Sequence, residues 1–382
     1  MYTFDELIDR RHTESTKWDR YKGKVQRDDL LPMWLADMDL PASDAVREAL
    51  MKRASHPIYG YSDRGYQYYE LFAERFHNRF NYKITADDVI LSTGVMYSIA
   101  AAIHLFTQPK DGVLLLMPCY HPFVSCVENS GRRVIRADMT VHEQRYEIDF
   151  DLLECLIAED TSIQALLLCN PHNPSGRVFG VEELTRLAAF CEQHSLLIIS
   201  DEIHSDFVYD TEFIPIMGMS AYAEQHTIAC VSPTKAFNLA GLKISAILVK
   251  NEKMKKTLKD YCSLIGISSI NIFAMEAVKA AYLKSEEWQK ELLSYLRENR
   301  SILAAFVEQH KNQITAYCPQ GTYFYWMRFH EDIHEKLLHE EGLILNHGVE
   351  FCESCSAYER LNFACPRPLL QEGLRRLDIF LK

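Results

Sequence analysis

The sequence predicts an α/β fold in which a large domain carries a smaller α+β domain. In the middle of the chain short apolar runs alternate with helical stretches, a pattern typical of mainly parallel strands that are buried on both faces of a sheet. After about residue 274 long amphipathic segments replace this alternation. A chain of 382 residues is also long enough to form more than one core.

The predicted strands of the large domain are runs of small and branched apolar residues. They cover residues 89–91, 113–117, 165–169, 196–199, 228–231 and 244–249. Between the middle runs, apolar residues at helical spacing in 181–194 (VEELTRLAAFCEQH) predict one of the helices that connect parallel strands.

The smaller domain is predicted from the segments that follow. Residues 273–310 favour a long amphipathic helix that is interrupted near Ser285. Strand-like runs at 322–329 and 360–365 and helix-like runs at 331–341 and 368–381 come after it. We expect residues 48–283 to form the large domain, and residues 1–47 together with 284–382 to form the smaller one.

Charge and hydropathy exclude several classes of function. The formal net charge of −12, without a block of lysines and arginines, argues against a nucleic-acid-binding surface. No apolar run approaches membrane-spanning length, and the N-terminal residues mix acids and bases where a secretory signal would be basic and then apolar. We therefore expect a cytoplasmic protein whose partners are small molecules or proteins.

The cysteines do not indicate a disulfide framework. The chain has 11 of them, an odd number without framework spacing, which is typical of reduced thiols. Cys352 and Cys355 form a C-x-x-C motif, but a structural zinc site would need a second such pair or a suitable pair of histidines. We interpret these two residues as incidental thiols and expect no metal site.

Lys235 is the first residue that suggests a chemistry. It follows the apolar run 228–231 and a proline turn, and a lysine in such surroundings loses hydration, which lowers its pKa toward a nucleophilic free amine. A Schiff-base lysine is one interpretation, and a solvated loop lysine is another. Ser232 and Lys235 also fit the S-x-x-K motif of serine β-lactamases, but the S-D-N and K-T-G tripeptides of those enzymes are absent.

Three successive strand ends carry residues of matching chemistry. Asn173 follows the run 165–169, Asp201 follows 196–199, and Lys235 follows 228–231. The carboxyl ends of parallel strands form one edge of the sheet, where ligands bind. Taken singly, each residue also suits a turn, a helix cap or a solvated loop. Together they suit pyridoxal phosphate (PLP), which needs an amine for its aldehyde, a carboxylate for its pyridine nitrogen and a hydrogen-bond donor for its phenolic oxygen.

Two further segments fit the same cofactor. Residues 89–95 lead from a strand into a helix that is expected to begin near Met96, and free N–H groups at a helix N-terminus bind phosphate. Gly94 would let the backbone approach closely. Tyr120, just after the run 113–117, is placed to cover the ring of the cofactor, although a tyrosine buried in the core is an equally good interpretation.

The chain resembles fold-type I PLP enzymes of the aminotransferase class I/II superfamily over essentially its whole length. The motifs that carry the resemblance are NPHNPSG (170–176), SDEIH (200–204) and SPTKAFNLAGLK (232–243). Within the superfamily it looks most like the MalY/PatB-type cystathionine β-lyase branch of bacterial C–S lyases. The segments behind that narrower match are 17–19 (KWD), 32–39 (PMWLADMD), 59–61 (YGY), 172–179 (HNPSGRVF) and 360–367 (RLNFACPR).

The resemblance implies a mostly parallel seven-stranded sheet flanked by helices, PLP as cofactor, and a homodimer with shared active sites. It also implies roles for individual residues. The catalytic positions are Lys235, Asp201 and Tyr120; the cofactor-binding positions are these three with Asn173, Gly94, Val95, Ser232, Lys243, His204 and Tyr61; and the substrate-binding positions are Arg360, Asn173 and Ala36. Tyr61 is the residue expected to reach the phosphate in the neighbouring subunit.

The activity that the resemblance implies is α,β-elimination of cystathionine or another cysteine-S-conjugate to a thiol, pyruvate and ammonia. An amino-acid aminotransferase with the same residues is the nearest alternative, because the two reactions separate only after the Cα proton is removed. A PLP-fold protein with a regulatory, protein-binding role is the second alternative.

Overall fold

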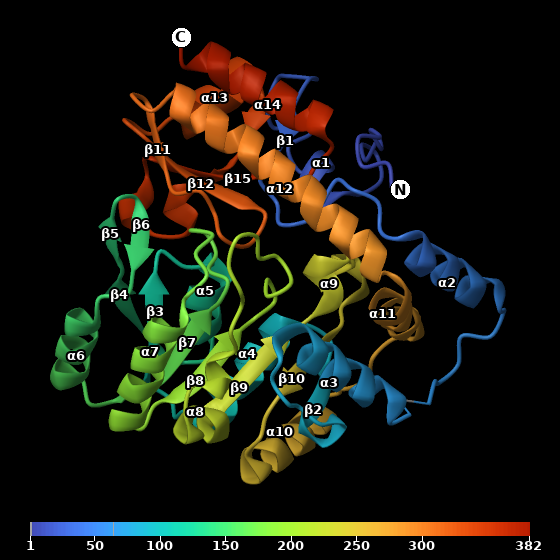
Figure 1. The fold of residues 1–382 in the computed structure, drawn as a ribbon, viewed down its shortest axis with the longest axis vertical. Coiled ribbons are helices and arrows are strands. Elements are labelled where there is room, and N and C mark those ends of the chain that lie inside the picture. The colour runs from blue at the N-terminus through green and yellow to red at the C-terminus, as the bar shows by residue number, and fades with distance from the viewer. Residues whose placement is uncertain (1, 64) are drawn as a thin grey trace.

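A seven-stranded sheet lies at the centre of the computed structural model, which describes residues 2–63 and 65–382 (Figure 1). The strand order is β2-β10-β9-β8-β7-β3-β4, and all neighbours are parallel except β10, which is antiparallel to β2 and β9. The expected α/β class with a mostly parallel sheet is confirmed. The strands are β2 Val89–Ser92, β3 Gly112–Met117, β4 Arg133–Asp138, β7 Ile163–Cys169, β8 Leu197–Asp201, β9 Thr227–Val231 and β10 Ser245–Leu248.

Six of these strands lie where the apolar runs predict them, because each run is buried on both faces. On β3, Val113 and Leu115 pack into one core and Leu114 and Leu116 into another, as the alternation of side chains along a strand requires. Strand β4 was not predicted. It lies at the sheet edge, and its sequence RVIRAD exposes several charged residues and lacks a continuous apolar run.

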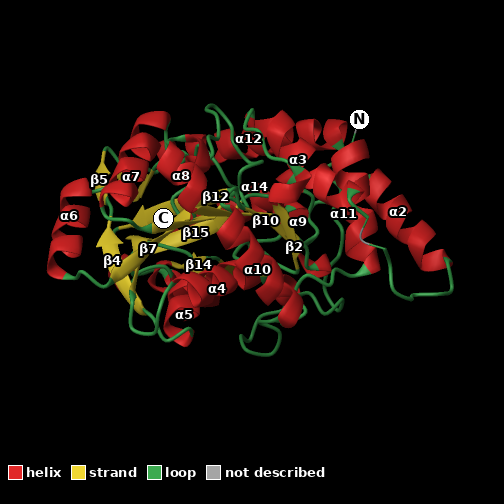
Figure 2. Cartoon of the chain, turned by 90° about the horizontal axis from the view of Figure 1, so that it is seen from below, coloured by secondary structure: helices red, strands yellow, loops and turns green. Residues whose placement is uncertain are grey.

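Helices cover both faces of the large sheet (Figure 2). One face packs against α4, α5 and α10, and the other against α3, α6, α7 and α11. The helices of this part of the chain are α3 Gln67–Phe80, α4 Val95–Phe106, α5 His121–Asn129, α6 Phe150–Glu159, α7 Val181–Gln193, α8 Ala221–His226, α9 Pro233–Ala236, α10 Glu252–Leu264 and α11 Ile272–Lys284. A separate small hairpin pairs β5 Thr140–His142 with β6 Arg145–Glu147.

A smaller antiparallel sheet lies above the carboxyl edge of the large one (Figure 1). Its strands, in order, are β11 Ile314–Ala316, β12 Phe324–Phe329, β15 Tyr358–Asn362 and β14 Asn346–His347. The helices packed around it are α12 Glu286–Gln309, α13 His334–Glu341 and α14 Arg367–Phe380. The predicted interruption near Ser285 is confirmed, because this residue separates α11 from α12. The division of the chain into domains at residues 47 and 283 stays a prediction.

The N-terminal segment is joined to the C-terminal part of the chain. Its elements are α1 Thr16–Asp19, β1 Leu31–Pro32 and α2 Asp44–Ser55, and β1 pairs in parallel with β13 Leu343–Ile344. The buried carboxylate of Asp39 accepts hydrogen bonds from Lys17 at 2.6 Å, Arg10 at 2.6 Å and the indole of Trp18 at 2.7 Å. A buried carboxylate is stable only with such partners, so these contacts fix the path of residues 34–40 over the large sheet.

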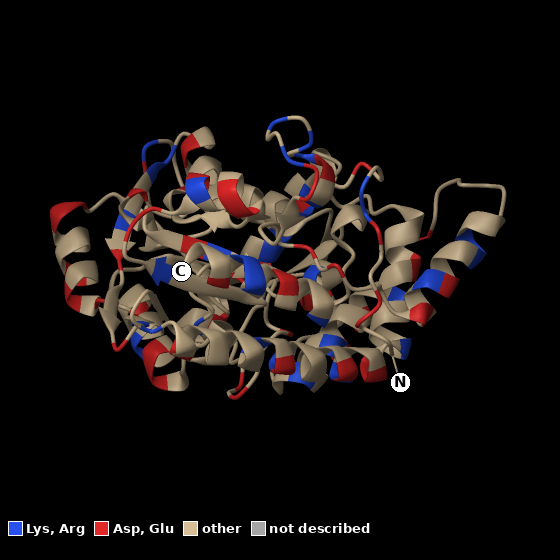
Figure 3. Ribbon diagram, turned by 90° about the horizontal axis from the view of Figure 1, so that it is seen from above, with Lys and Arg blue, Asp and Glu red and all other residues tan. Residues whose placement is uncertain are grey.

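The surface mixes charges of both signs. Lys and Arg are interspersed with Asp and Glu along the same helices (Figure 3). In the part of the chain that the structure describes, no helix combines the length and the apolar character needed to cross a bilayer.

The loop after β7 is fastened to the segment that precedes β12. The N–H groups of Gln320 and Gly321 both donate to the carbonyl of Gly176, at 2.8 and 2.9 Å. Gly176 has a φ of +69°, and a Cβ at this position would lie 2.4 Å from the Cβ of Pro319. Glycine is therefore required here both for its backbone conformation and for the close approach of the two segments.

We expect Gly176→Ala to destabilise the protein more than Gly131→Ala. Gly131 also has a positive φ, of +73°, but a Cβ there meets open space. Both variants carry the left-handed strain of about 1–2 kcal/mol. Only G176A adds the steric conflict with Pro319, which we expect to cost a further ~1–3 kcal/mol. Urea unfolding of the two variants measures the difference, and equal losses would show that the loop moves away without cost.

Candidate active site

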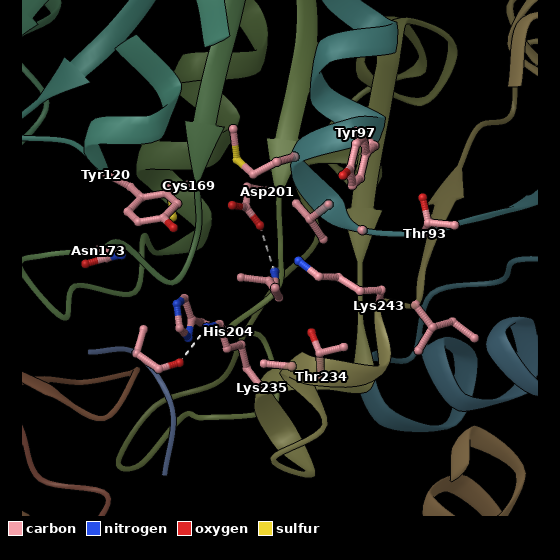
Figure 4. A pocket seen from close by; sticks show the side chains of 17 residues that line it. Thr93, Tyr97, Tyr120, Cys169, Asn173, Asp201, His204, Thr234, Lys235 and Lys243 are labelled. Carbon is pink, nitrogen blue, oxygen red and sulfur yellow. Dashed lines mark hydrogen bonds between the residues drawn. The ribbon is translucent and has the colours of Figure 1, made fainter. Parts of the chain in front are cut away.

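A cavity of about 210 Å³ lies at the carboxyl edge of the parallel strands (Figure 4). The segments that follow β2, β3, β7, β8 and β9 all contribute side chains to it, as does the segment that precedes β10. Strand β10 runs antiparallel, so its beginning lies at the same edge as the ends of its neighbours. The cavity thus occupies the position where ligands bind in open α/β sheets.

Most of the residues expected at a cofactor site line this one cavity. Asn173, Asp201 and Lys235, expected from their strand ends, all contribute to its wall. The other predicted residues in the wall are Ala36, Gly94, Val95, Tyr120, His204 and Lys243. Three predicted residues lie outside it: Ser232, Arg360 and Tyr61.

Lys235 extends into the cavity from the short helix α9. Ser232 caps this helix, because its hydroxyl accepts from the N–H of Thr234 at 3.1 Å. The Lys235 ammonium donates to the carbonyl of Ala36 at 2.5 Å. Desolvation lowers the pKa of Lys235 to about 8, although the nearby Asp37 carboxylate acts in the opposite direction. A substantial fraction of this amine is therefore unprotonated slightly above neutral pH, as a nucleophilic amine requires.

Asp201 is the last residue of β8 and is buried at the cavity wall. Its Oδ1 accepts the N–H of Ile203 at 3.0 Å, the contact drawn as a dashed line in Figure 4. Burial raises the pKa of Asp201 to about 7. A buried carboxylate that accepts a backbone N–H is suited to a further, cationic N–H donor inside the cavity, such as a protonated pyridine.

His204 is a second buried group that faces the cavity. Its Nδ1 has no hydrogen-bond partner within residues 2–63 and 65–382. Burial, followed by the charges of Lys235 and Arg360, holds the pKa of His204 well below its usual value. The ring is therefore neutral at physiological pH and offers one donor or acceptor to a ligand.

The opposite end of the cavity has the features of an anion site. Gly94 caps α4, and the N–H groups of Val95 and the next residues begin the helix without partners from a preceding turn. Lys243 lies at the same end with its ammonium directed into the cavity (Figure 4). Its φ of +55° places a non-glycine residue in the left-handed region, a form of strain that is concentrated at functional sites.

The hydroxyl of Ser232 has partners within the fold. It donates to the carbonyl of Ile244 at 2.6 Å and lies 2.7 Å from the hydroxyl of Thr234. Thr234 lines the cavity, whereas Ser232 does not. The phosphate-binding role expected for Ser232 stays a prediction, and Thr234 is the hydroxyl residue nearer to the cavity.

Arg360 lies behind Asn173, away from the cavity wall. Its guanidinium donates to Asn173 Oδ1 at 2.8 Å, to the carbonyl of Trp34 at 2.9 Å and to Asn346 Oδ1 at 2.7 Å. Burial lowers its pKa to about 10, so the group keeps its charge at neutral pH. Its buried Nε–H has no hydrogen-bond partner among the described residues. Arg360 thus keeps one unsatisfied donor beside its contacts with Asn173 and Asn346.

Several wall and support residues were not predicted. Thr93 precedes Gly94 in the S-T-G run, which could have indicated it, whereas Tyr97 lies in the first turn of α4 with its ring next to Gly94. Cys169 is the last residue of a predicted strand and forms part of the cavity floor. Asn346 is different, because only the pairing of β14 with β15, with Asn346 opposite Arg360, brings it to the guanidinium.

Residues 34–377 match the family model of class I and II aminotransferases. The chain belongs to this family. The expected similarity to PatB/MalY-type cystathionine β-lyases is confirmed by relatives that are 28–33% identical over nearly the whole chain. One is cystathionine β-lyase PatB of Bacillus subtilis (strain 168), which is 33% identical over 385 aligned residues that cover 99% of each chain.

Solved structures of the family agree with this fold. A PLP-bound putative aminotransferase from Clostridium difficile 630 is 35% identical and superposes with a TM-score of 0.94 over 100% of both chains. Cystalysin from Treponema denticola, which contains PLP, is 29% identical with a TM-score of 0.93, over 100% of this chain and 99% of that one.

The residues of the cavity fit PLP as the cofactor that family membership implies. An amine of lowered pKa, a buried carboxylate, a neutral histidine and a helix N-terminus with a nearby ammonium all border one space. These groups match the aldehyde, the pyridine nitrogen, the phenolic oxygen and the phosphate of the cofactor.

The raised pKa of Asp201 predicts a pH-dependent stability for protein stripped of cofactor. An unfolded aspartate titrates near about 3.9, so the folded state binds this proton more tightly. The resulting stabilisation is complete below the unfolded pKa and is lost as the pH rises through a folded pKa of about 7.

We therefore expect Asp201→Asn, which cannot ionise, to become more stable relative to the wild type as the pH rises from about 4 to about 8, by up to ~4 kcal/mol. Urea unfolding of both proteins across this range measures the change. A stability difference that is independent of pH would contradict the raised pKa.

Proposed function

We propose that this protein is a PLP-dependent C–S β-lyase that cleaves cystathionine or a related cysteine-S-conjugate to a thiol, pyruvate and ammonia. The observation that supports this most directly is the convergence of Lys235, Asp201 and Asn173 on one cavity, with Arg360 bound to Asn173. The similarity to cystathionine β-lyases of Bacillus subtilis and Corynebacterium glutamicum, at 33% and 32% identity, favours this reaction within the family.

Each end of the cofactor has its own set of proposed ligands. Lys235 binds its aldehyde, Asp201 keeps its pyridine nitrogen protonated, and Asn173 and His204 contact its phenolic oxygen. Gly94, Val95, Lys243 and Ser232 are the proposed phosphate ligands, and Tyr120 covers the ring. When bound, the cofactor supplies an electron sink for the carbanion that forms at Cα of an amino acid.

Lys235 is the proposed general base. Lys235 would hold the aldehyde of the cofactor at rest and, once freed by a substrate amino group, would take the proton from Cα. Its lowered pKa, about 8, suits this step, because the neutral form is well populated and its conjugate acid can return a proton to the departing thiolate. The carbonyl of Ala36, 2.5 Å from Nζ, orients the amine.

Arg360 is the proposed ligand of the substrate α-carboxylate. The guanidinium is permanently charged and planar, and its position is fixed by Asn173, Asn346 and the Trp34 carbonyl. A carboxylate bound here would pair with the Nε–H, which has no partner among the described residues. Ala36, whose carbonyl contacts Lys235, would border the same substrate.

We also propose a cytoplasmic homodimer in which Tyr61 completes the phosphate site of the partner subunit. Tyr61 is fully exposed and belongs to a segment, residues 56–63, that also exposes Ile58 and Tyr59. A run of exposed apolar and aromatic side chains favours a protein interface. The free cysteines suit a reducing compartment such as the cytoplasm.

An amino-acid aminotransferase is the second candidate. The similarity to a putative aminotransferase of Clostridium difficile, at 35% identity, favours it. The proposed roles of Lys235, Asp201 and Arg360 are the same for both reactions, which differ in whether a group leaves Cβ or a proton returns to the cofactor.

We expect Lys235→Ala to abolish turnover and covalent attachment of the cofactor. Borohydride reduction of wild-type protein with PLP should leave a pyridoxyl label on the peptide that contains Lys235, as detected by mass spectrometry. Labelling of protein stripped of cofactor should be faster at about pH 9 than at about pH 7, because an amine with a pKa of about 8 is mostly neutral at the higher pH and mostly protonated at the lower one.

Lys243→Ala is the matched control for this experiment. It removes an ammonium from the same cavity, and we expect it to weaken cofactor affinity while the label stays on Lys235. A label of undiminished intensity in K235A would exclude Lys235 as the attachment site.

We expect purified protein with PLP to release pyruvate and a thiol from cystathionine when no 2-oxo acid is present. Stoichiometric formation of pyruvate, thiol and ammonia measures elimination, and addition of a 2-oxo acid should leave the rate unchanged. An absolute requirement for the 2-oxo acid, with transfer of the amino group to it, would replace the lyase assignment by the aminotransferase.

A further inference from the structure

The C-x-x-C motif forms a tight turn in the loop between β14 and β15. The N–H of Cys355 donates to the carbonyl of Cys352 at 2.9 Å, so the motif closes a four-residue turn. The Cα atoms at the ends of such a turn lie within about 7 Å of each other, which overlaps the range that a disulfide spans. Two cysteines held in this way need little backbone movement to be joined.

The two thiols interact and are unequal. The nearby Cys355 thiol lowers the pKa of Cys352 to about 5, and the Cys352 sulfur raises the pKa of Cys355. The hydroxyl of Ser354, 3.2 Å from the Cys352 sulfur, lowers the pKa of Cys352 further. Cys352 is half-buried and Cys355 is buried. Cys352 therefore has the character of an attacking thiolate, and Cys355 that of the thiol that resolves the product.

In seven other cysteines the pKa of the thiol is raised, in contrast to that of Cys352. Burial raises the pKa of Cys119, Cys126, Cys169, Cys191, Cys230, Cys262 and Cys365. Only Cys155 and Cys318 are exposed within the described residues. These two provide matched controls, because they are accessible but have no second cysteine in a C-x-x-C motif.

The loop is connected to the proposed substrate site through Phe351, the residue before Cys352. Its ring lies 4.8 Å from the Arg360 guanidinium carbon and 5.3 Å from the ring of Trp326. Its carbonyl accepts the N–H of Cys119, the neighbour of Tyr120, at 3.2 Å. Phe351 is buried, so a displacement of its backbone must also alter the contacts of Arg360 or of the segment that carries Tyr120.

We propose that Cys352 and Cys355 are a redox-active dithiol that low-molecular-weight disulfides oxidise, and that this oxidation weakens substrate binding at Arg360. The Cys352 thiolate attacks a disulfide R–S–S–R, which forms a mixed disulfide and releases R–S⁻. Cys355 then loses its proton and attacks the Cys352 sulfur, which forms the internal disulfide and releases the second R–S⁻. Two electrons pass from the dithiol to the disulfide, and the Cys355 proton goes to a released thiolate.

The covalent half of the proposal is tested on the holoenzyme with glutathione disulfide. After alkylation of the remaining thiols, mass spectrometry should find the peptide with Cys352 and Cys355 unalkylated and lighter by two hydrogens, and dithiothreitol should restore both thiols. Cys355→Ser should stop at a stable glutathione adduct on Cys352, and Cys352→Ser should prevent the reaction of this peptide.

Cys155→Ser and Cys318→Ser should leave formation of the internal disulfide unchanged. Two alkylatable thiols at Cys352 and Cys355 in wild-type protein, under conditions that modify Cys155 or Cys318, would overturn the proposal. So would an adduct on Cys355 in place of Cys352.

The second half rests on the proposed function, since it requires Arg360 to bind the substrate. Oxidised enzyme, with the disulfide verified by mass spectrometry, should show a KM for the amino acid raised several-fold, and dithiothreitol should reverse the change. The Cys352→Ser enzyme should show no change in KM with the same treatment. An unchanged KM in oxidised enzyme would overturn this half. Failure of the proposed function is distinguishable, because reduced enzyme would then also lack lyase activity.

Discussion

One buried cation holds three distant parts of the chain together. The guanidinium of Arg360 is almost inaccessible to solvent, and a buried charge persists in a protein only where hydrogen-bond partners replace water. Its partners come from the N-terminal segment at Trp34, from the loop after β7 at Asn173, and from β14 at Asn346. The rings of Phe324 and Phe351 pack against its faces at 4.1 and 4.8 Å. The position of each part is therefore constrained by the same side chain.

Burial also explains the pKa shifts of the titratable groups that line the cavity. Burial favours the neutral forms of a lysine and a histidine as well as of an aspartate, so the same loss of water lowers the pKa of Lys235 and His204 and raises that of Asp201. Lys235 and Asp201, which would be fully ionised in water, therefore titrate close to neutral pH at this edge of the sheet, and His204 stays neutral. A cofactor with an aldehyde and a basic ring nitrogen would use the lowered pKa of Lys235 and the raised pKa of Asp201.

The sequence predicted what depends on local pattern and on strand order. Continuous apolar runs predicted six central strands, and the polar residue after each run fell at one edge because parallel strands share a direction. Contacts made across the fold were not predictable in this way. The hydrogen bond from Arg360 to Asn346 depends on the register of β14 against β15, and β14 has only two residues. The hydroxyl of Ser232 is directed to the carbonyl of Ile244, a choice that only the packing of the loop decides.

The reversed direction of β10 has a consequence for how the cavity is built. A parallel strand beside β9 would need a crossover of about a dozen residues or more and would begin at the far edge of the sheet. Because β10 is antiparallel, one connection from β9 to β10 stays at the carboxyl edge and contains both Lys235 and Lys243. The spacing between Lys235 and Lys243 is thus set within a single connection of the chain, which includes α9. The same connection donates hydrogen bonds to the N-terminal segment, from Lys235 to the carbonyl of Ala36 and from Asn238 to the carbonyls of Met38 and Leu40, so a movement of that segment relative to the large sheet would also change the contacts of Lys235.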